Sequence, residues 1–137
     1  MPVPDLADLL PALYATLDER RFTDLSTLFT AGARGTTPGG TAEGVDALIA
    51  QAQRGHESIP ALQHLITGVV TDTDGETATL RANIVTIFAD ATHTPTFELG
   101  EVWRGHALRD TTGWRISDFT MTPVWQRGTR PTPSPQP

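Results

Sequence analysis

The spacing of apolar residues changes halfway along the chain, from a helical period to a strand period. Near the N-terminus, leucines recur at intervals of three and four residues, at Leu6, Leu9, Leu10, Leu13 and Leu17. This spacing predicts an amphipathic helix over about 5–20. Because proline removes a hydrogen bond from a helix interior, the helix either bends at Pro11 or starts late, with Pro11 in its first turn. Shorter helices are expected at 22–29 and 45–53, the second stopped by a glycine. The Gly-, Thr- and Pro-rich residues 30–44 are typical of a long loop with room for a short strand near its start.

The second half of the chain alternates between apolar and polar residues, which is the pattern of half-buried strands. Four strands are predicted, at 61–71, 76–90, 96–109 and 114–125. The segments DTDG (72–75) and DTTG (110–113) are typical of hairpin turns, and a further turn is expected near His93. Helices followed by long antiparallel strands predict an α+β fold whose sheet curls around helices on one face.

The length and composition fit a single domain over residues 1–128. Residues 129–137 are proline-rich and polar, and we expect a disordered tail there. A net charge of −6 without a basic cluster disfavours nucleic acid and anionic membranes as partners. The absence of cysteine excludes disulfides and thiolate chemistry. Because neither a signal peptide nor an apolar run of about 18–20 residues is found, a cytoplasmic location is expected.

One histidine lies where the strand pattern requires a buried residue. In the stretch IPALQHLITGVV (59–70), alternation places His64 on the same face as Leu62 and Ile66. Two interpretations follow. His64 is either a core residue whose nitrogens are hydrogen-bonded, or a group that lines a cavity and transfers protons there.

Asp118 is a second polar residue that the strand alternation places on the same face as apolar residues. It alternates with Trp114, Ile116 and Thr120, so it should face inward if the two apolar residues do. A buried carboxylate in that position is either an acid–base catalyst or an ion-pair partner of Arg104 on the neighbouring strand. The hairpin register decides the outcome, because a slip of one residue turns these side chains outward.

Three aromatic or imidazole groups complete the candidates derived from the residues themselves. Tyr14 lies one helical turn before Asp18, so both side chains can point to the same place. Trp103 could stack on a flat ligand or be buried at a dimer interface. His56 and His93 are both expected to lie in turns and to be exposed to solvent. No pair of side chains shows the spacing of metal ligands, so no metal site is predicted.

The order of these motifs resembles the nuclear transport factor 2-like superfamily, and within it the SnoaL-like group of polyketide cyclases. The resemblance rests on Leu17-Asp18 before Phe22, on Leu28-Phe29, on Gly44 before the third helix, on His64 and on Gly113-Trp114-Arg115-Ile116. It covers roughly residues 5–125. It implies a cone-shaped barrel, in which three N-terminal helices pack in the concavity of a curved, mainly antiparallel sheet and enclose a pocket.

The resemblance also implies roles for individual residues. His64, preceded by Gln63, is similar to the proton-transferring strand histidine of scytalone dehydratase, and Asp18 is similar to the helix aspartate of that enzyme. The tyrosine expected before this aspartate is replaced by Leu17, and Phe88 lies where a second histidine is expected. Relative to the late catalytic aspartate of SnoaL-type cyclases, Asp118 is two residues early, and Thr120 is nearer the position.

Together these observations favour a cofactor-independent acid–base enzyme acting on a small, mostly apolar metabolite by cyclisation, isomerisation, dehydration or epoxide opening. The expected catalytic residues are His64, Asp18 and Asp118. The expected substrate contacts are Tyr14, Phe88, Trp103, Arg104 and Thr120. An arginine-rich, lysine-free composition suggests a high-GC bacterium and natural-product biosynthesis. A homodimer is expected from relatives. The alternative is a non-catalytic module of the same fold that binds a small molecule or dimerises.

Overall fold

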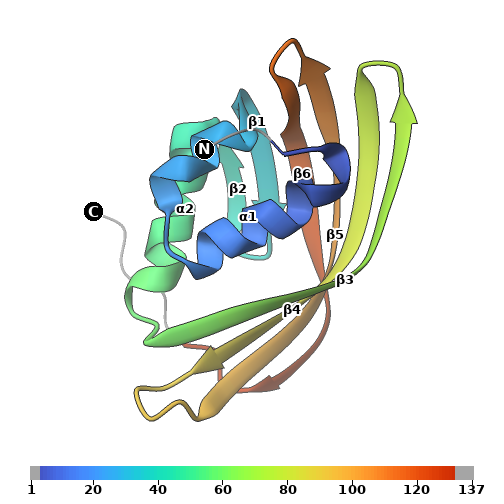
Figure 1. Cartoon of the computed structure of the whole chain (residues 1–137). Coiled ribbons are helices and arrows are strands. Elements are labelled where there is room, and N and C mark those ends of the chain that lie inside the picture. Colours follow the sequence, from blue (N-terminus) through green and yellow to red (C-terminus); the bar gives the residue numbers. More distant parts are fainter. Residues whose placement is uncertain (1–3, 132–137) are drawn as a thin grey trace.

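The two apolar periods produce a layer of helices and one long sheet in the computed structural model, which describes residues 4–131 (Figure 1). The helical elements are η1 (Leu6–Asp8), α1 (Leu9–Asp18), η2 (Phe22–Thr27) and α2 (Val45–Glu57). The strands are β1 (Phe29–Thr37), β2 (Gly40–Glu43), β3 (Ala61–Asp74), β4 (Thr77–Ala89), β5 (Pro95–Asp110) and β6 (Gly113–Gly128).

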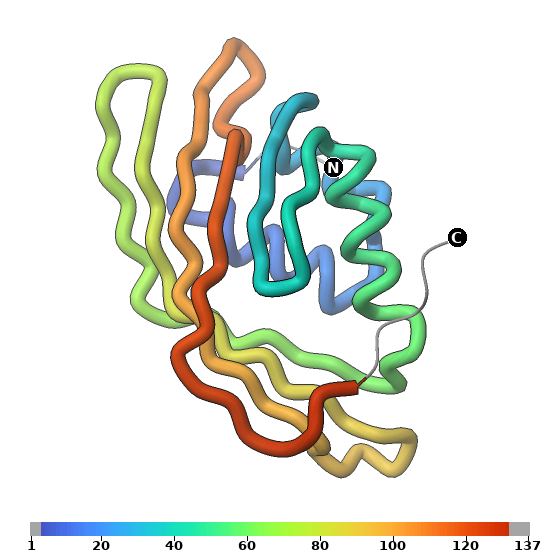
Figure 2. The backbone as a smooth tube through the Cα atoms, turned by 180° about the vertical axis from the view of Figure 1, so that it is seen from behind, coloured from blue at the N-terminus to red at the C-terminus, as the bar shows by residue number. Residues whose placement is uncertain are grey.

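The six strands form a single sheet in the order β2-β1-β6-β5-β4-β3. All neighbours are antiparallel except β1 and β6, which run parallel. Figures 1 and 2 show the sheet bending around α1 and α2, which lie on its concave side. The expected α+β cone, with helices in the concavity of a curved, mainly antiparallel sheet, is confirmed.

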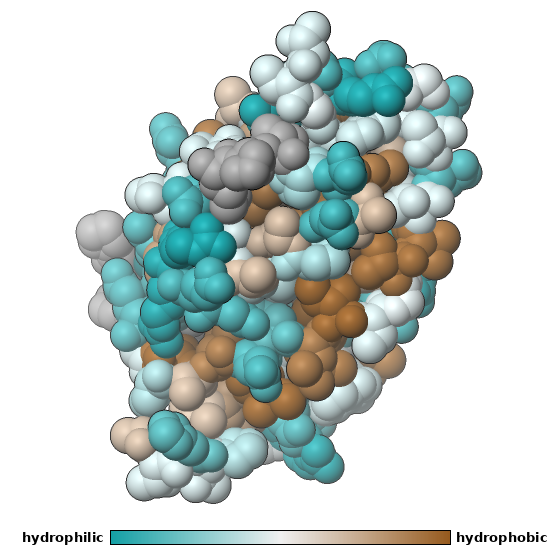
Figure 3. Space-filling model, in the orientation of Figure 1, coloured by the Kyte–Doolittle hydropathy of each residue, from teal (hydrophilic) through white to brown (hydrophobic). Residues whose placement is uncertain are grey.

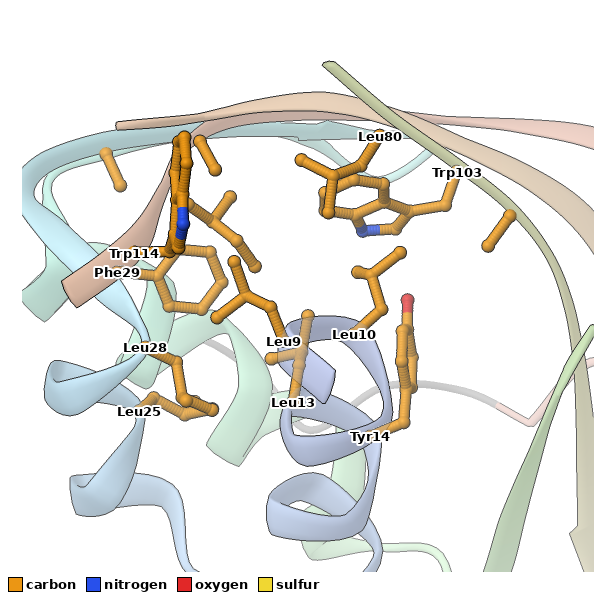
Figure 4. Packing of buried hydrophobic residues seen from close by; sticks show 14 of the residues in the cluster. Leu9, Leu10, Leu13, Tyr14, Leu25, Leu28, Phe29, Leu80, Trp103 and Trp114 are labelled. Carbon is orange, nitrogen blue, oxygen red and sulfur yellow. The ribbon is translucent and has the colours of Figure 1, made fainter. Parts of the chain in front are cut away.

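The first helix begins late, as one of the two alternatives at Pro11 predicted. A short 3₁₀ turn precedes α1, and Pro11 is the third residue of the α-helix, where its missing N–H has no partner to lose. The leucine stripe of α1 is buried against the sheet, and Figure 4 shows Leu10 and Tyr14 pointing toward Trp103. The helix therefore presents one apolar face to the concavity.

The expected loop over 30–44 is wrong, because most of it forms the hairpin of β1 and β2. Its threonines and small residues suit a strand, and Ala33 and Ala42 are buried beneath the helices. The following helix, α2, also runs past Gly55 to Glu57 instead of stopping there.

The predicted alternation in β4 is confirmed by burial. Its inward residues Ala78, Leu80, Ala82, Ile84 and Thr86 are all buried, and they pack toward α1 and Trp103. Burying such side chains removes apolar surface from water, at about 25 cal/mol per Å². This inner row continues into the lining of the cavity described below.

Bulges break the alternation of the other strands. In β3 the pairing shifts between Thr67 and Val70, at a bulge where Gly68 has φ +60°, a value that favours glycine. In β6, Ile116 pairs with Ala107 and Asp118 with His106, so Ser117 is one extra residue. Each bulge bends its strand and moves the following side chains to the other face of the sheet.

Part of the predicted tail, residues 132–137, lies outside the described residues, and the tail stays a prediction. Among residues 4–131, no helix has both the length and the apolar character needed to cross a membrane.

Candidate functional site

His64 is held by a carboxylate from α1. Its Nδ1 lies 2.6 Å from Oδ1 of Asp18, and its backbone N–H donates to Oδ2 at 3.2 Å. Because a carboxylate only accepts hydrogen bonds, Nδ1 carries the hydrogen and Nε2 keeps a free lone pair. The His64 side chain is 9% exposed and that of Asp18 is 26% exposed. This pair has the geometry of a general base with one fixed tautomer.

His64 lines a cavity of about 500 Å³ between the helices and the sheet. Most of the lining is apolar, and it includes Leu13, Leu62, Phe88, Trp103 and Phe119. The polar groups that face it are few: Tyr14, His56, His64, Thr86 and Glu101 are among them. A mostly apolar cavity with a small number of convergent polar groups is typical of a small-molecule site.

Tyr14 connects the helix to the far wall of the cavity. Its ring lies 4.7 Å from that of His64, and its hydroxyl donates to Sδ of Met121 at 3.7 Å. Burial raises the pKa of the Tyr14 phenol, and the carboxylates of Glu101 and Asp18 raise it further. A sulfur acceptor is weak, so the phenol is a neutral donor that a ligand oxygen could engage.

His56 is buried, and the expectation that it is exposed is wrong. The residue is 8% exposed near the end of α2, and its Nδ1–H donates to the carbonyl of Ala52 at 2.7 Å. Burial lowers the pKa of His56 and keeps the ring neutral. Its Nε2 has no partner within the described chain. The guanidinium of Arg20 donates to the carbonyls of His56 and Ile59, which ties the ends of α1 and α2 to the start of β3.

Most of the chain also matches a known protein family. A family model described as a SnoaL-like domain matches residues 4–120. The chain belongs to the SnoaL-like family. Among curated proteins, none matches this SnoaL-like chain.

Solved structures share the fold of this SnoaL-like protein at low sequence identity. A protein from Kribbella flavida superposes with a TM-score of 0.81 at 20% identity, over 90% of both chains. A candidate scytalone dehydratase from Novosphingobium aromaticivorans gives 0.81 at 14% identity, over 94% of this chain and 88% of the other. A type 2 hexachlorocyclohexane dehydrochlorinase gives 0.80 at 14% identity, over 96% and 90%.

The structure turns Asp118 out of the SnoaL-like cavity, contrary to expectation. Because Ser117 is an extra residue, Ile116 and Phe119 face inward while Asp118 faces outward. There its Oδ1 accepts a hydrogen bond from Nδ1 of His106 at 2.8 Å, and both side chains are about half exposed. The bulge thus removes this carboxylate from the proposed catalytic set.

Arg104 and Thr120 also lie on the outer face of the sheet. They pair with each other across β5 and β6, and with Asp118 they border a separate hollow of about 450 Å³. The predicted pairing of Arg104 with Asp118 is wrong because the hairpin pairs Trp114 with Arg109 instead of Leu108, and the extra residue Ser117 shifts the register by one more. Neither residue lines the cavity that holds His64, so the expected substrate contacts through them are wrong as well.

The remaining predicted contacts do reach the cavity. Phe88 lines it from β4, where its ring packs edge-on against Phe97. Trp103 forms part of the wall, fully buried and stacked on Phe119 with 5.4 Å between ring centroids. Sequence reasoning missed two polar groups, His56 and Glu101. The strand phase could have revealed Glu101, since it alternates with Trp103 and Leu99.

Proposed function

We propose that this SnoaL-like protein is a cofactor-independent acid–base enzyme that removes a proton from carbon in a small, mostly apolar metabolite. The observation that carries the proposal is the His64–Asp18 pair facing an apolar cavity of about 500 Å³. An imidazole that presents a free Nε2 lone pair to a mostly apolar cavity is suited to general-base catalysis.

In the proposed step, Nε2 of His64 accepts the proton and the Nδ1–H keeps its bond to Asp18. The aspartate stays ionised and compensates the positive charge that the ring acquires. Its two oxygens both accept from His64, so the imidazole is held in one orientation. The neutral Tyr14 phenol, beside the ring, can stabilise an oxygen on which negative charge develops.

Among cyclisation, isomerisation, dehydration and epoxide opening, we favour elimination. Two structures with the same fold carry the names of elimination enzymes, a dehydratase and a dehydrochlorinase. Elimination begins with the proton abstraction that the His64 geometry supports. The arginine-rich, lysine-free composition supports a place in bacterial natural-product biosynthesis. We also infer a homodimer that associates through apolar side chains on the outer face of the sheet.

A probe reaction tests the base without knowledge of the natural substrate. In 5-nitro-1,2-benzisoxazole, a base removes the carbon-bound proton, the N–O bond breaks, and a coloured nitrile phenolate forms. We expect wild-type protein to accelerate this reaction and His64→Gln to lose about 10²–10⁴-fold of the rate. Glu57→Gln, at an exposed site on α2, is the control and should match wild type.

A non-catalytic binding module gives the opposite result. In that case the probe binds in the cavity, but wild type and His64→Gln open it at the same rate. Circular dichroism and thermal unfolding of each variant establish that a lost rate does not come from a lost fold.

A further inference from the structure

Glu101 is a carboxyl group that the proton-abstraction step does not use, although it faces the same cavity. It projects from β5 between Leu99 and Trp103, two other cavity-lining residues, and it is only 7% exposed. Within residues 4–131 it has no hydrogen-bond partner. Among the described residues, the side-chain polar atoms that are fully buried without a partner are His56 Nε2 and Trp103 Nε1, so the Glu101 oxygens stay accessible from the cavity. A ligand there can supply the hydrogen bond that the protein does not.

The sheet register places Glu101 on the same wall of the cavity as His64, two strands away. Glu101 pairs with Ile84 on β4, and Ile84 pairs with Ile66 on β3, the next inward residue after His64. The two side chains therefore come from adjoining rows on strands two spacings apart, which is about 10 Å between backbones. Since they lie on the concave side, both line the same cavity of about 500 Å³.

The surroundings of Glu101 favour its neutral form. Burial raises the pKa of its carboxyl, and the guanidinium of Arg130, in the segment after β6, opposes this less strongly. The other titratable or charged side chains that line the cavity are Tyr14 on α1, Arg54 and His56 on α2, His64 on β3 and Arg130 after β6. Burial raises the pKa of the Tyr14 phenol and keeps it neutral. A carboxyl that holds its proton carries an O–H, so Glu101 can donate a hydrogen bond in that form, whereas an ionised group only accepts.

We propose that Glu101 is the general acid of the site and donates a hydrogen bond to an oxygen atom of the ligand, two strands along the cavity wall from the His64 base. This deepens and rests on the proposed function, and it assigns the substrate class: a small ring compound that carries a hydroxyl or carbonyl oxygen close to the carbon that loses its proton. A carboxyl and an imidazole that face one cavity can divide the acid and base roles between them.

The elimination balances with these two groups alone. His64 removes the proton from carbon, the C–H electron pair becomes the second bond of a C=C, and the neighbouring C–O bond breaks. Glu101 gives its proton to the departing hydroxyl, which leaves as water. The imidazolium then loses its proton, and the Glu101 carboxylate regains one, through solvent.

Binding of two matched probes tests this role without turnover. 2-Acetylnaphthalene carries a carbonyl oxygen that only accepts hydrogen bonds, and 2-ethylnaphthalene has the same shape without it. By calorimetry we expect wild type at pH 5 to bind the ketone about fivefold to tenfold more tightly than the hydrocarbon. Glu101→Met should lose most of this preference and keep only what the Tyr14 phenol contributes, while Glu101→Gln, which keeps a donor, and the control Glu57→Gln should retain it.

The pH dependence of the preference for the ketone distinguishes a protonated Glu101 carboxyl from a general effect of polar side chains in the cavity wall. With His64→Gln as the background, so that no imidazolium donates to the ligand, the preference for the ketone should fall as pH rises, because an ionised Glu101 has no hydrogen to donate. In the His64→Gln/Glu101→Gln double variant the preference should not change with pH. A preference that is absent in wild type, or that survives in full in Glu101→Met, overturns the proposal. If the preference depends on Glu101 but His64→Gln opens the benzisoxazole as fast as wild type, the donor role stands and the proposed enzymatic function fails.

Discussion

At the scale of single residues, Asp18 determines what His64 can do. Both carboxylate oxygens bind this one histidine, one through the ring and one through the backbone amide. The carboxylate fixes the hydrogen on Nδ1, and the reactive lone pair is therefore on the nitrogen that is left free. The chemistry of the ring depends on a residue 46 positions earlier in the chain.

Changing Asp18 to asparagine tests this dependence. The amide can donate to Nδ1 and so favour the tautomer with hydrogen on Nε2, which cannot act as a base. We expect Asp18→Asn to reduce the rate of benzisoxazole opening by about 10²–10⁴-fold. Asp24→Asn, at an exposed carboxylate on η2, is the matched control. Equal rates for Asp18→Asn and wild type would show that the carboxylate does not select the tautomer.

The sequence predicted some of these residues and missed others for physical reasons. His64 lies on the inner face of β3 because no bulge interrupts the strand before it, so simple alternation held. His56 was misplaced because the helix continues through Gly55, and Leu48, Ala52 and His56 then share one helical face at intervals of four. Burial of the His56 ring depends on the residues by which α2 extends past Gly55.

At the scale of elements, the bulge at Ser117 decides which residues in the second half of β6 face the cavity. Before it, Trp114 and Ile116 face inward, and after it, Phe119 and Met121 do. Nothing in the alternation of residues marks this one-residue insertion, since SDFT reads as a regular strand. The general fold was accessible because hydrophobic period and turn residues are local. The face of the sheet to which side chains point beyond a bulge was not accessible, because the position of a bulge depends on pairing with the partner strand.

Deleting Ser117 should turn the end of β6 over. The inward phase of Phe119 and Met121 would be lost, and with it part of the cavity wall. We expect the free energy of unfolding to fall by roughly 3 kcal/mol, the value of about one large apolar side chain moved into water. Urea unfolding followed by circular dichroism measures it. Ser117→Ala, which keeps the register, should stay within about 0.5 kcal/mol of wild type. A deletion as mild as this control would mean that the bulge is dispensable.

At the scale of the whole molecule, the sheet has two different faces. The concave face holds the helices and the cavity. The outer face carries an apolar row across four strands, where Leu65 pairs with Val85, Val85 with Gly100 and Gly100 with Trp125. The indole of Trp125 lies over Gly100 and leaves no room for a Cβ there, yet it remains 43% exposed. Seen from the helix side, apolar side chains also gather along β3 (Figure 3).

An apolar row on an outer sheet face is suited to self-association through that face. We expect the protein to sediment as a dimer and Trp125→Lys to sediment as a monomer with unchanged circular dichroism. Thr23→Lys, at an exposed site on η2 on the helix side of the sheet, is the control and should remain dimeric. A wild-type protein that sediments as a monomer at all concentrations contradicts the homodimer.

The distribution of tryptophans has a practical consequence. Of the three in the sequence, only Trp103 lines the cavity, where it is fully buried and stacked on Phe119. The other two lie elsewhere, Trp114 in the core and Trp125 on the outer face. A molecule entering the cavity therefore alters the emission of one indole while the other two supply a constant background. The protein carries its own fluorescent reporter of occupancy, and candidate substrates can be screened without a label.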